Sequence, residues 1–186
     1  GRLTQLSLQL DEKDWFVSGD FIDLTAAPVT DTPGVAELYG HFSASRDYIR
    51  VDLQGQDGLL RWTDAFNRDM PYQSLQARLE AVLEQGQWQL TLPQLQLRHP
   101  ELELDAQMQL WLGPKPGMSL LAELRGVKVD QAQHYFPHRP MPASVIRSLQ
   151  PALISGDIPS ARVLWHGDFA DFPYAGGQGK FQALAD

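Results

Sequence analysis

The chain has 186 residues, of which 43% are hydrophobic and 20% are charged, so it can bury a sizeable core and is not intrinsically disordered. It contains no Cys, which excludes disulfides, thiol nucleophiles and Cys-ligated metals. Fifteen Lys and Arg stand scattered among 23 Asp and Glu, and the formal charge of −8 argues against a nucleic-acid partner.

The N-terminal third alternates between apolar and polar residues. In residues 3–10, Leu6, Leu8 and Leu10 share one face of a strand, opposite Gln, Ser and Gln. The same period of two predicts further strands at residues 15–21, 35–43 and 48–54, with turns between them and a Pro- and Gly-containing loop at 28–34. Residues 59–62 are too short to assign alone, and residues 63–71 are polar enough for an exposed loop. These segments predict an antiparallel meander.

The middle of the chain carries the longest alternating runs. Residues 75–83, 88–92 and 102–112 each place Leu, Ala, Met or Trp on every second position, and Leu95 and Leu97 continue the second run beyond Pro93. A helix is the competing interpretation for residues 72–85, because Leu75, Leu79 and Val82 also fit helical spacing and the segment is rich in helix-forming residues. Since every flanking segment alternates with period two, we favour a strand there.

The pattern changes after a further strand at residues 119–125. Residues 141–154 have apolar residues at helical spacing, Gly156 supplies a stop, and Pro151 predicts a kink or a break. Strands resume at residues 161–165 and 178–185. The chain is therefore expected to be mainly β: a long antiparallel meander over residues 1–126, a short helical insertion within 127–156, centred on residues 130–155, and further strands over 157–186.

No residue pattern predicts catalysis. His134 and His138 have the spacing of helical zinc ligands, but Pro137 and Pro140 make a regular helix there improbable. Glu101, Glu103 and Asp105 are two apart, as paired carboxylates might be, yet the opposite positions are apolar, so a solvated sheet face explains them better. We expect no enzyme activity, no metal and no cofactor.

The apolar strand faces allow two architectures. They could form the core of a closed β-sandwich acting as a structural or carbohydrate-binding module of a larger envelope protein. Alternatively, a sheet whose apolar face stays partly open would offer a continuous track for acyl chains. The residues themselves leave both possibilities open.

A family resemblance covers roughly residues 132–183. The residues that carry it are Tyr135, Phe136, Pro137, Met141, Pro142, Ala152, Leu153, Gly156, Gly167, Asp171, Phe172, Pro173, Gly179 and Phe181. In order and spacing they resemble the large AsmA-like proteins of the YhdP type from Gram-negative bacteria. Ser148 departs from the pattern, because such proteins tend to carry a Trp there.

The resemblance implies a single fragment of a larger periplasmic protein with an open, curved β-groove. Such proteins are anchored in the inner membrane by an N-terminal helix and are thought to pass phospholipids toward the outer membrane, which supports its barrier. The implied partners are phospholipid acyl chains, the inner membrane through an anchor outside these residues, and partners on the outer-membrane side. The implied groove residues are Leu6, Leu8, Leu10, Val51, Leu53, Leu79, Leu90, Leu92, Leu104, Met108 and Leu110.

Overall fold

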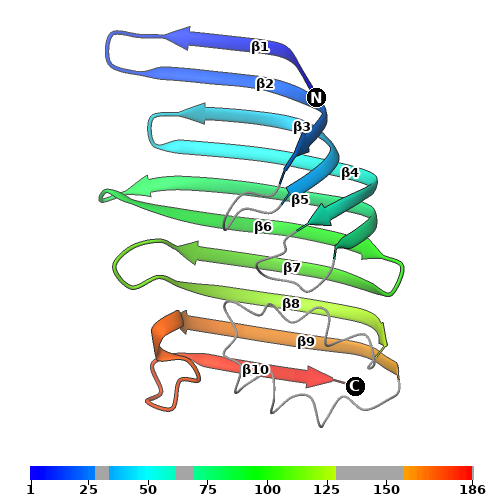
Figure 1. The fold of residues 1–186 in the computed structure, drawn as a ribbon. Coiled ribbons are helices and arrows are strands. Elements are labelled where there is room, and N and C mark those ends of the chain that lie inside the picture. Colours follow the sequence, from blue (N-terminus) through cyan, green and yellow to red (C-terminus); the bar gives the residue numbers. More distant parts are fainter. Residues whose placement is uncertain (28–33, 62–68, 129–156, 186) are drawn as a thin grey trace.

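The computed structural model describes residues 1–27, 34–61, 69–128 and 157–185, which form one ten-stranded antiparallel sheet (Figure 1). Each strand pairs with the strands before and after it in sequence, so the order runs from β1 to β10 without a crossover. The predicted meander is confirmed. Because β1 and β10 are the two edges, the described strands do not close into a barrel. The strands are β1 (Arg2–Leu10), β2 (Trp15–Ala26), β3 (Gly34–Ser45), β4 (Tyr48–Arg61), β5 (Met70–Glu84), β6 (Gln87–His99), β7 (Leu102–Trp111), β8 (Gly117–Lys128), β9 (Asp157–Asp168) and β10 (Lys180–Ala185).

The segment with two competing interpretations is a strand. β5 covers Met70–Glu84 and pairs along nearly its whole length with β4 on one side and β6 on the other. Its period of two buries Leu75, Ala77 and Ala81 on one face. Ladder hydrogen bonds to two neighbours thus override the helix-forming tendency of the individual residues.

Several strands are longer than the sequence pattern suggested. β4 continues to Arg61, so residues 59–61, which the sequence left unassigned, extend an established ladder with β5. The predicted loop at residues 63–71 extends too far at its C-terminal end. Met70 and Pro71 belong to β5, where they pair with Leu60 and Leu59. The ends of these strands are set by pairing with a neighbouring strand. The alternation within a single segment does not reveal that pairing.

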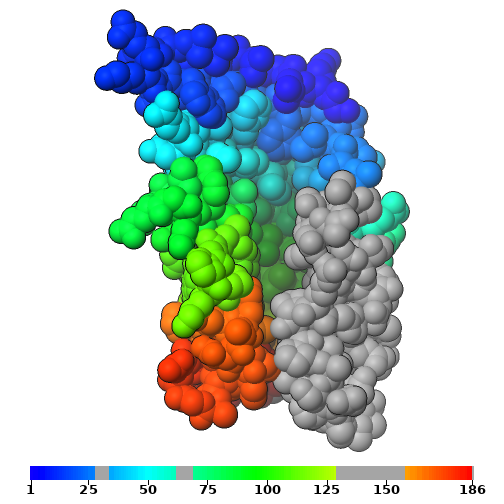
Figure 2. Space-filling model, turned by 60° about the vertical axis from the view of Figure 1, so that its left-hand side comes forward, coloured from blue at the N-terminus to red at the C-terminus, as the bar shows by residue number. Residues whose placement is uncertain are grey.

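The sheet is curved by irregularities on neighbouring strands. Asp23, Glu37 and Asp57 have positive φ angles of 56°, 62° and 50°, and they lie beside shifts in the β2–β3 and β3–β4 registers. Such bulges bend strands and increase their twist. Figure 1 shows the strands curling near these bulges, and Figure 2 shows the surface of the described strands in order from the N-terminal strands at the top to the C-terminal strands at the bottom.

The C-terminal strands are capped by a compact loop. After β9, the 3-10 helix η3 (Phe169–Asp171) and the following turns lead back to β10, which begins at Lys180, two residues later than expected. Buried Trp165 packs there against Phe172 and Phe181, and its Nε1 donates a hydrogen bond of 2.6 Å to the hydroxyl of Tyr174.

The expected helical insertion lies outside the described residues, apart from Val127 and Lys128, which belong to β8. The same holds for the motif residues Tyr135, Pro137, Met141, Leu153 and Gly156, and for His134 and His138. Within the described ranges, η3 is the one helical element, and no helix there has the length and hydropathy needed to span a membrane.

Candidate functional site

The sheet has one apolar face, here called the groove face. Directly paired residues of antiparallel strands lie on the same face, so the register traces the groove face across the whole sheet. One row of partners crosses nine strands, from Leu8 in β1 to Gly167 in β9: Leu8, Val17, Ala44, Ile49, Ala81, Leu90, Leu110, Met118 and Gly167. Every member is an apolar residue or Gly, so the groove face is continuously apolar along this row.

All eleven predicted groove residues lie on the groove face. Val51 pairs with Leu79, Leu53 with Ala77, and Leu92 with Met108, in rows parallel to the first. The eight in β4–β7 are half-buried. The three in β1 are largely exposed, with relative exposures of 62% for Leu6, 60% for Leu8 and 74% for Leu10.

Three buried Ala share one row of the groove face, and this alignment was not predicted. Ala77, Ala106 and Ala122, all buried, occupy β5, β7 and β8, with Leu95 between the first two on β6. Larger side chains flank this row on both sides, in the rows through Leu92, Met108 and Leu120 and through Leu75, Leu97, Leu104 and Leu124. Each Ala was recognisable as an apolar position, but only the cross-strand register places the three in one row.

Burial is confined to the groove face. The buried apolar side chains all lie on it or, like Tyr174, in the loop that packs against it. Apolar side chains of the opposite face, here called the outer face, are exposed or half-buried, and the exposed ones include Leu121 at 54% and Leu184 at 57%. Side chains on the inside of a bend converge and shield one another, so this difference places the groove face on the concave side.

The described residues do not form a closed sandwich. They make a single sheet, and none of their large side chains falls below 2% relative exposure. A sandwich would pack a second sheet against the groove face and exclude water from its centre. Of the two architectures left open by the sequence, the described strands form the open one.

The outer face is polar and crossed by ion pairs. Asp105 pairs with Arg98 at 3.2 Å and Arg125 at 3.3 Å, and Arg125 also contacts Glu123 at 3.2 Å. Asp105 and Glu103 thus belong to a solvated sheet face, as the sequence predicted, whereas Glu101 precedes the strand in a turn. These carboxylates are structural partners of arginines.

Asp52 is the most strongly bridged carboxylate of the outer face. It accepts hydrogen bonds from Nε of Arg50 and Nε of Arg78. Desolvation is the largest single influence and raises the pKa of Asp52, but the two guanidinium hydrogen bonds and charges together outweigh it, so the pKa is lowered from 3.8. Asp52 is therefore a charged link between neighbouring strands.

The described motif residues contribute to the cluster of Trp165, Phe172, Tyr174 and Phe181, here called the aromatic cap. Phe172 and Phe181 pack edge-to-face at 5.6 Å between ring centroids, and the peptide between Phe172 and Pro173 is cis. Gly179 is required because a Cβ there would collide with the Tyr174 ring. The motif residues of this region therefore pack together. The sequence analysis missed Trp165 and Tyr174 at the centre of the aromatic cap, because their contact depends on the fold of the loop.

No group of three or more His, Cys, Asp or Glu capable of holding a metal occurs in the part of the chain that the structure describes. The feature that distinguishes this chain is a surface: a continuous apolar face on the concave side of an unclosed meander. The fold and this face define an open β-groove protein.

The comparisons agree with this class. The family model described as YhdP protein matches residues 1–186, and the chain therefore belongs to the YhdP family. A search of curated proteins and a search of solved structures find no match.

Proposed function

We propose that this chain is a periplasmic segment of an AsmA-like protein that carries phospholipid acyl chains along its groove face between the inner and outer membranes. The observation that carries the proposal is the unbroken apolar row across nine strands, on the concave side of a sheet whose edges remain unpaired among the described strands. Family membership supports the same function.

The shape of the groove face suits an acyl chain. The row through Ala77, Leu95, Ala106 and Ala122 lies between two rows of larger side chains and would serve as the floor. It runs across the strands rather than along them. A methylene chain laid on this floor would be removed from water at roughly 0.8 kcal/mol per buried CH₂. The groove-face rows that the register traces through the described strands carry no charged side chain, so the contact would be with the tails.

Half-burial of the groove leucines suits transit rather than tight binding. Leu90, Leu92 and Met108 keep part of their surface exposed, so a lipid tail can exchange with water or with the next tail without unpacking a core. Transport requires that each contact be replaceable, which uniform apolar contacts allow. On this proposal the segment performs no catalysis and binds no cofactor.

Gentle purification followed by native mass spectrometry and thin-layer analysis tests the proposal. We expect phospholipid to co-purify with the protein and to be displaced by other acyl-chain compounds. Protein that is folded and free of lipid after such extraction would contradict the proposal.

A further inference from the structure

The outer face carries a straight ladder of polar side chains that the groove does not use. Six directly paired residues on the adjacent strands β4–β9 form it, and we call it the outer ladder: Gln54, Gln76, Gln96, Asp105, Glu123 and Arg162. Neighbouring strands lie about 4.8 Å apart, so the ladder presents one polar group per strand over roughly 24 Å.

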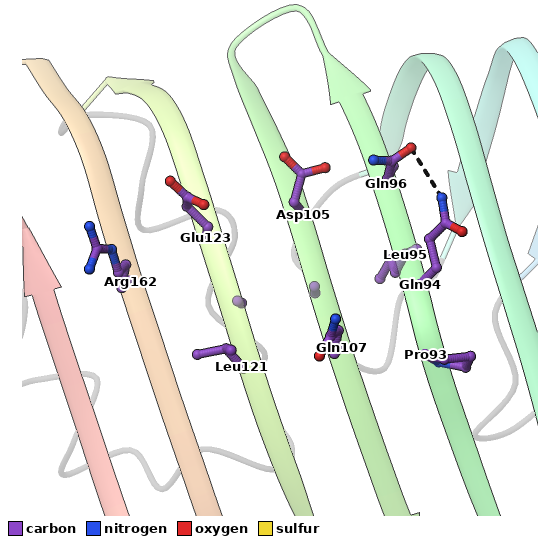
Figure 3. Close-up of a pocket in the computed structure, with 11 residues that line it drawn as sticks. Pro93, Gln94, Leu95, Gln96, Asp105, Gln107, Leu121, Glu123 and Arg162 are labelled. Atoms are coloured by element: carbon purple, nitrogen blue, oxygen red, sulfur yellow. Dashed lines mark hydrogen bonds between the residues drawn. The ribbon is translucent and has the colours of Figure 1, made fainter.

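The outer ladder lies within two neighbouring cavities. A cavity of about 240 Å³ is lined by Gln54 and Gln76 among others, and a cavity of about 290 Å³ by Gln96, Asp105, Glu123 and Arg162. Gln94 lines both, so the two follow one another along the same face. Figure 3 shows Gln96, Asp105, Glu123 and Arg162 projecting from four adjacent strands into the larger cavity.

The chemistry of the lining favours an uncharged ligand rich in hydroxyl or amide groups. Each Gln amide offers both donors and acceptors, and Asp105 retains acceptor capacity beyond its two arginines. The carboxylates are balanced by Arg98 and Arg125, and Arg162 makes no ion pair or side-chain hydrogen bond with the described residues. Charges thus largely cancel, which disfavours polyanions and polycations alike.

The pitch of the outer ladder separates the candidate polymers. An extended peptide repeats its side chains on one face about every 6.8 Å and would fall out of step with groups spaced about 4.8 Å apart. An extended peptide also binds a sheet by pairing along a strand edge rather than by crossing strands. One pyranose of an extended β-1,4-linked chain has nearly the length of one strand spacing. Successive sugars are turned over, but each carries hydroxyl groups on both of its edges, so each can hydrogen-bond to one rung.

We propose that the outer ladder binds a linear, β-1,4-linked glycan, laid across β4–β9 on the side of the sheet opposite the groove. The sugars hydrogen-bond to the glutamine amides and to the spare acceptors of Asp105 and Glu123, and Arg162 donates to ring or acetamido oxygens at one end. Leu121, exposed in the larger cavity, provides an apolar contact for a sugar face. The site is independent of the lipid proposal because it uses the other face of every strand.

Calorimetric titration with defined oligosaccharides tests this site on the intact chain. The probes are chitohexaose and cellohexaose, with their disaccharides and with α-linked maltohexaose for comparison. We expect saturable binding of a β-1,4 hexasaccharide at up to millimolar concentration, much weaker binding of the disaccharide because it spans few rungs, and none of maltohexaose.

Matched variants locate the binding. The double substitution Gln76→Ala and Gln96→Ala removes two central amides of the outer ladder and should weaken binding about tenfold or more. The control, Gln109→Ala with Gln182→Ala, removes two outer-face amides away from both cavities and should leave binding unchanged. Circular dichroism and melting temperature establish that both double variants remain folded.

Three results would overturn the proposal: no saturable binding of either β-1,4 hexasaccharide, equal binding of maltohexaose, or equal losses in the two double variants. Binding of an extended peptide that the ladder variant abolishes would also overturn it, and would identify the surface as a protein-docking site.

Discussion

Side chains of β7 differ in burial according to the face of the sheet on which they lie. Leu104 lies half-buried on the groove face, and Gln109 lies exposed on the outer face of the same strand. An acidic side chain costs little free energy at an exposed position and much more where it is surrounded by apolar neighbours without a cation.

Leu104→Asp is therefore expected to abolish most phospholipid co-purification, whereas Gln109→Asp, which adds the same charge, leaves it unchanged. The bound lipid is quantified by mass spectrometry against protein, and melting temperatures confirm that both variants fold. Equal lipid content in the two variants would contradict the assignment of Leu104 to a lipid-bearing face.

Asp52 makes a pH-dependent contribution to stability. Its folded-state pKa is lowered, so the stabilisation is fully present above about pH 4 and is lost as the pH falls through the lowered pKa. Because about a third of this side chain is exposed, we expect Asp52→Asn to cost less than about 1 kcal/mol at pH 7.

The cost of Asp52→Asn should shrink toward zero in acid, as measured by urea unfolding between pH 7 and pH 2. Asp171→Asn, at an exposed position in η3, serves as the control and should show no such change. A cost for Asp52→Asn that grows with acidity would show that the link to Arg50 and Arg78 does not act as described.

At the scale of elements, the bulges give the sheet its curvature. Asp57 has a φ of 50° beside the irregular part of the β3–β4 ladder. A β-branched residue is poorly accommodated in this left-handed conformation, whereas Gly adopts it freely. We expect Asp57→Val to destabilise the protein by about 1–2 kcal/mol and Asp57→Gly to be nearly neutral, as measured by denaturant unfolding.

Gln73→Val, at a position on the adjacent strand β5 that is also exposed, is the control and should cost much less than Asp57→Val. If Asp57→Val and Gln73→Val cost the same, the positive φ is not what makes position 57 sensitive.

The aromatic cap depends on one buried hydrogen bond. Tyr174→Phe leaves the Trp165 Nε1–H without its acceptor at a site where Trp165 is only 2% exposed. An unsatisfied buried donor costs about 1–3 kcal/mol, so we expect a lower melting temperature and faster amide exchange in residues 169–179. Tyr39→Phe, at an exposed position, should change neither quantity. Unchanged exchange in Tyr174→Phe would show that this bond does not hold the cap.

The sequence predicted strands and faces well because a period of two is a local property. It resolved the face of every β7 residue and favoured a strand for β5 despite helix-forming residues. It could not give the ends of β4 and β5, the row shared by Ala77, Ala106 and Ala122, or the outer ladder, since each of these depends on which residues of different strands become partners.

At the scale of the whole molecule, one sheet separates two surfaces of opposite character. The groove face gathers the buried apolar side chains, and the outer face gathers the ion pairs and glutamines. The curvature of the sheet affects both faces, because the bulges that shelter the groove face also spread the side chains of the outer face toward solvent. The central claim is that lipid tails lie on the groove face and nowhere else on the sheet.

Photocrosslinking along β7 in the intact protein tests this claim most directly. A photoreactive amino acid is placed in turn at each position from 103 to 110, and phospholipid adducts are quantified after irradiation in cells. We predict adducts that alternate with period two, strong at positions 104, 106, 108 and 110 and weak at 103, 105, 107 and 109. Adducts without alternation, or concentrated on the odd-numbered positions, would contradict the account.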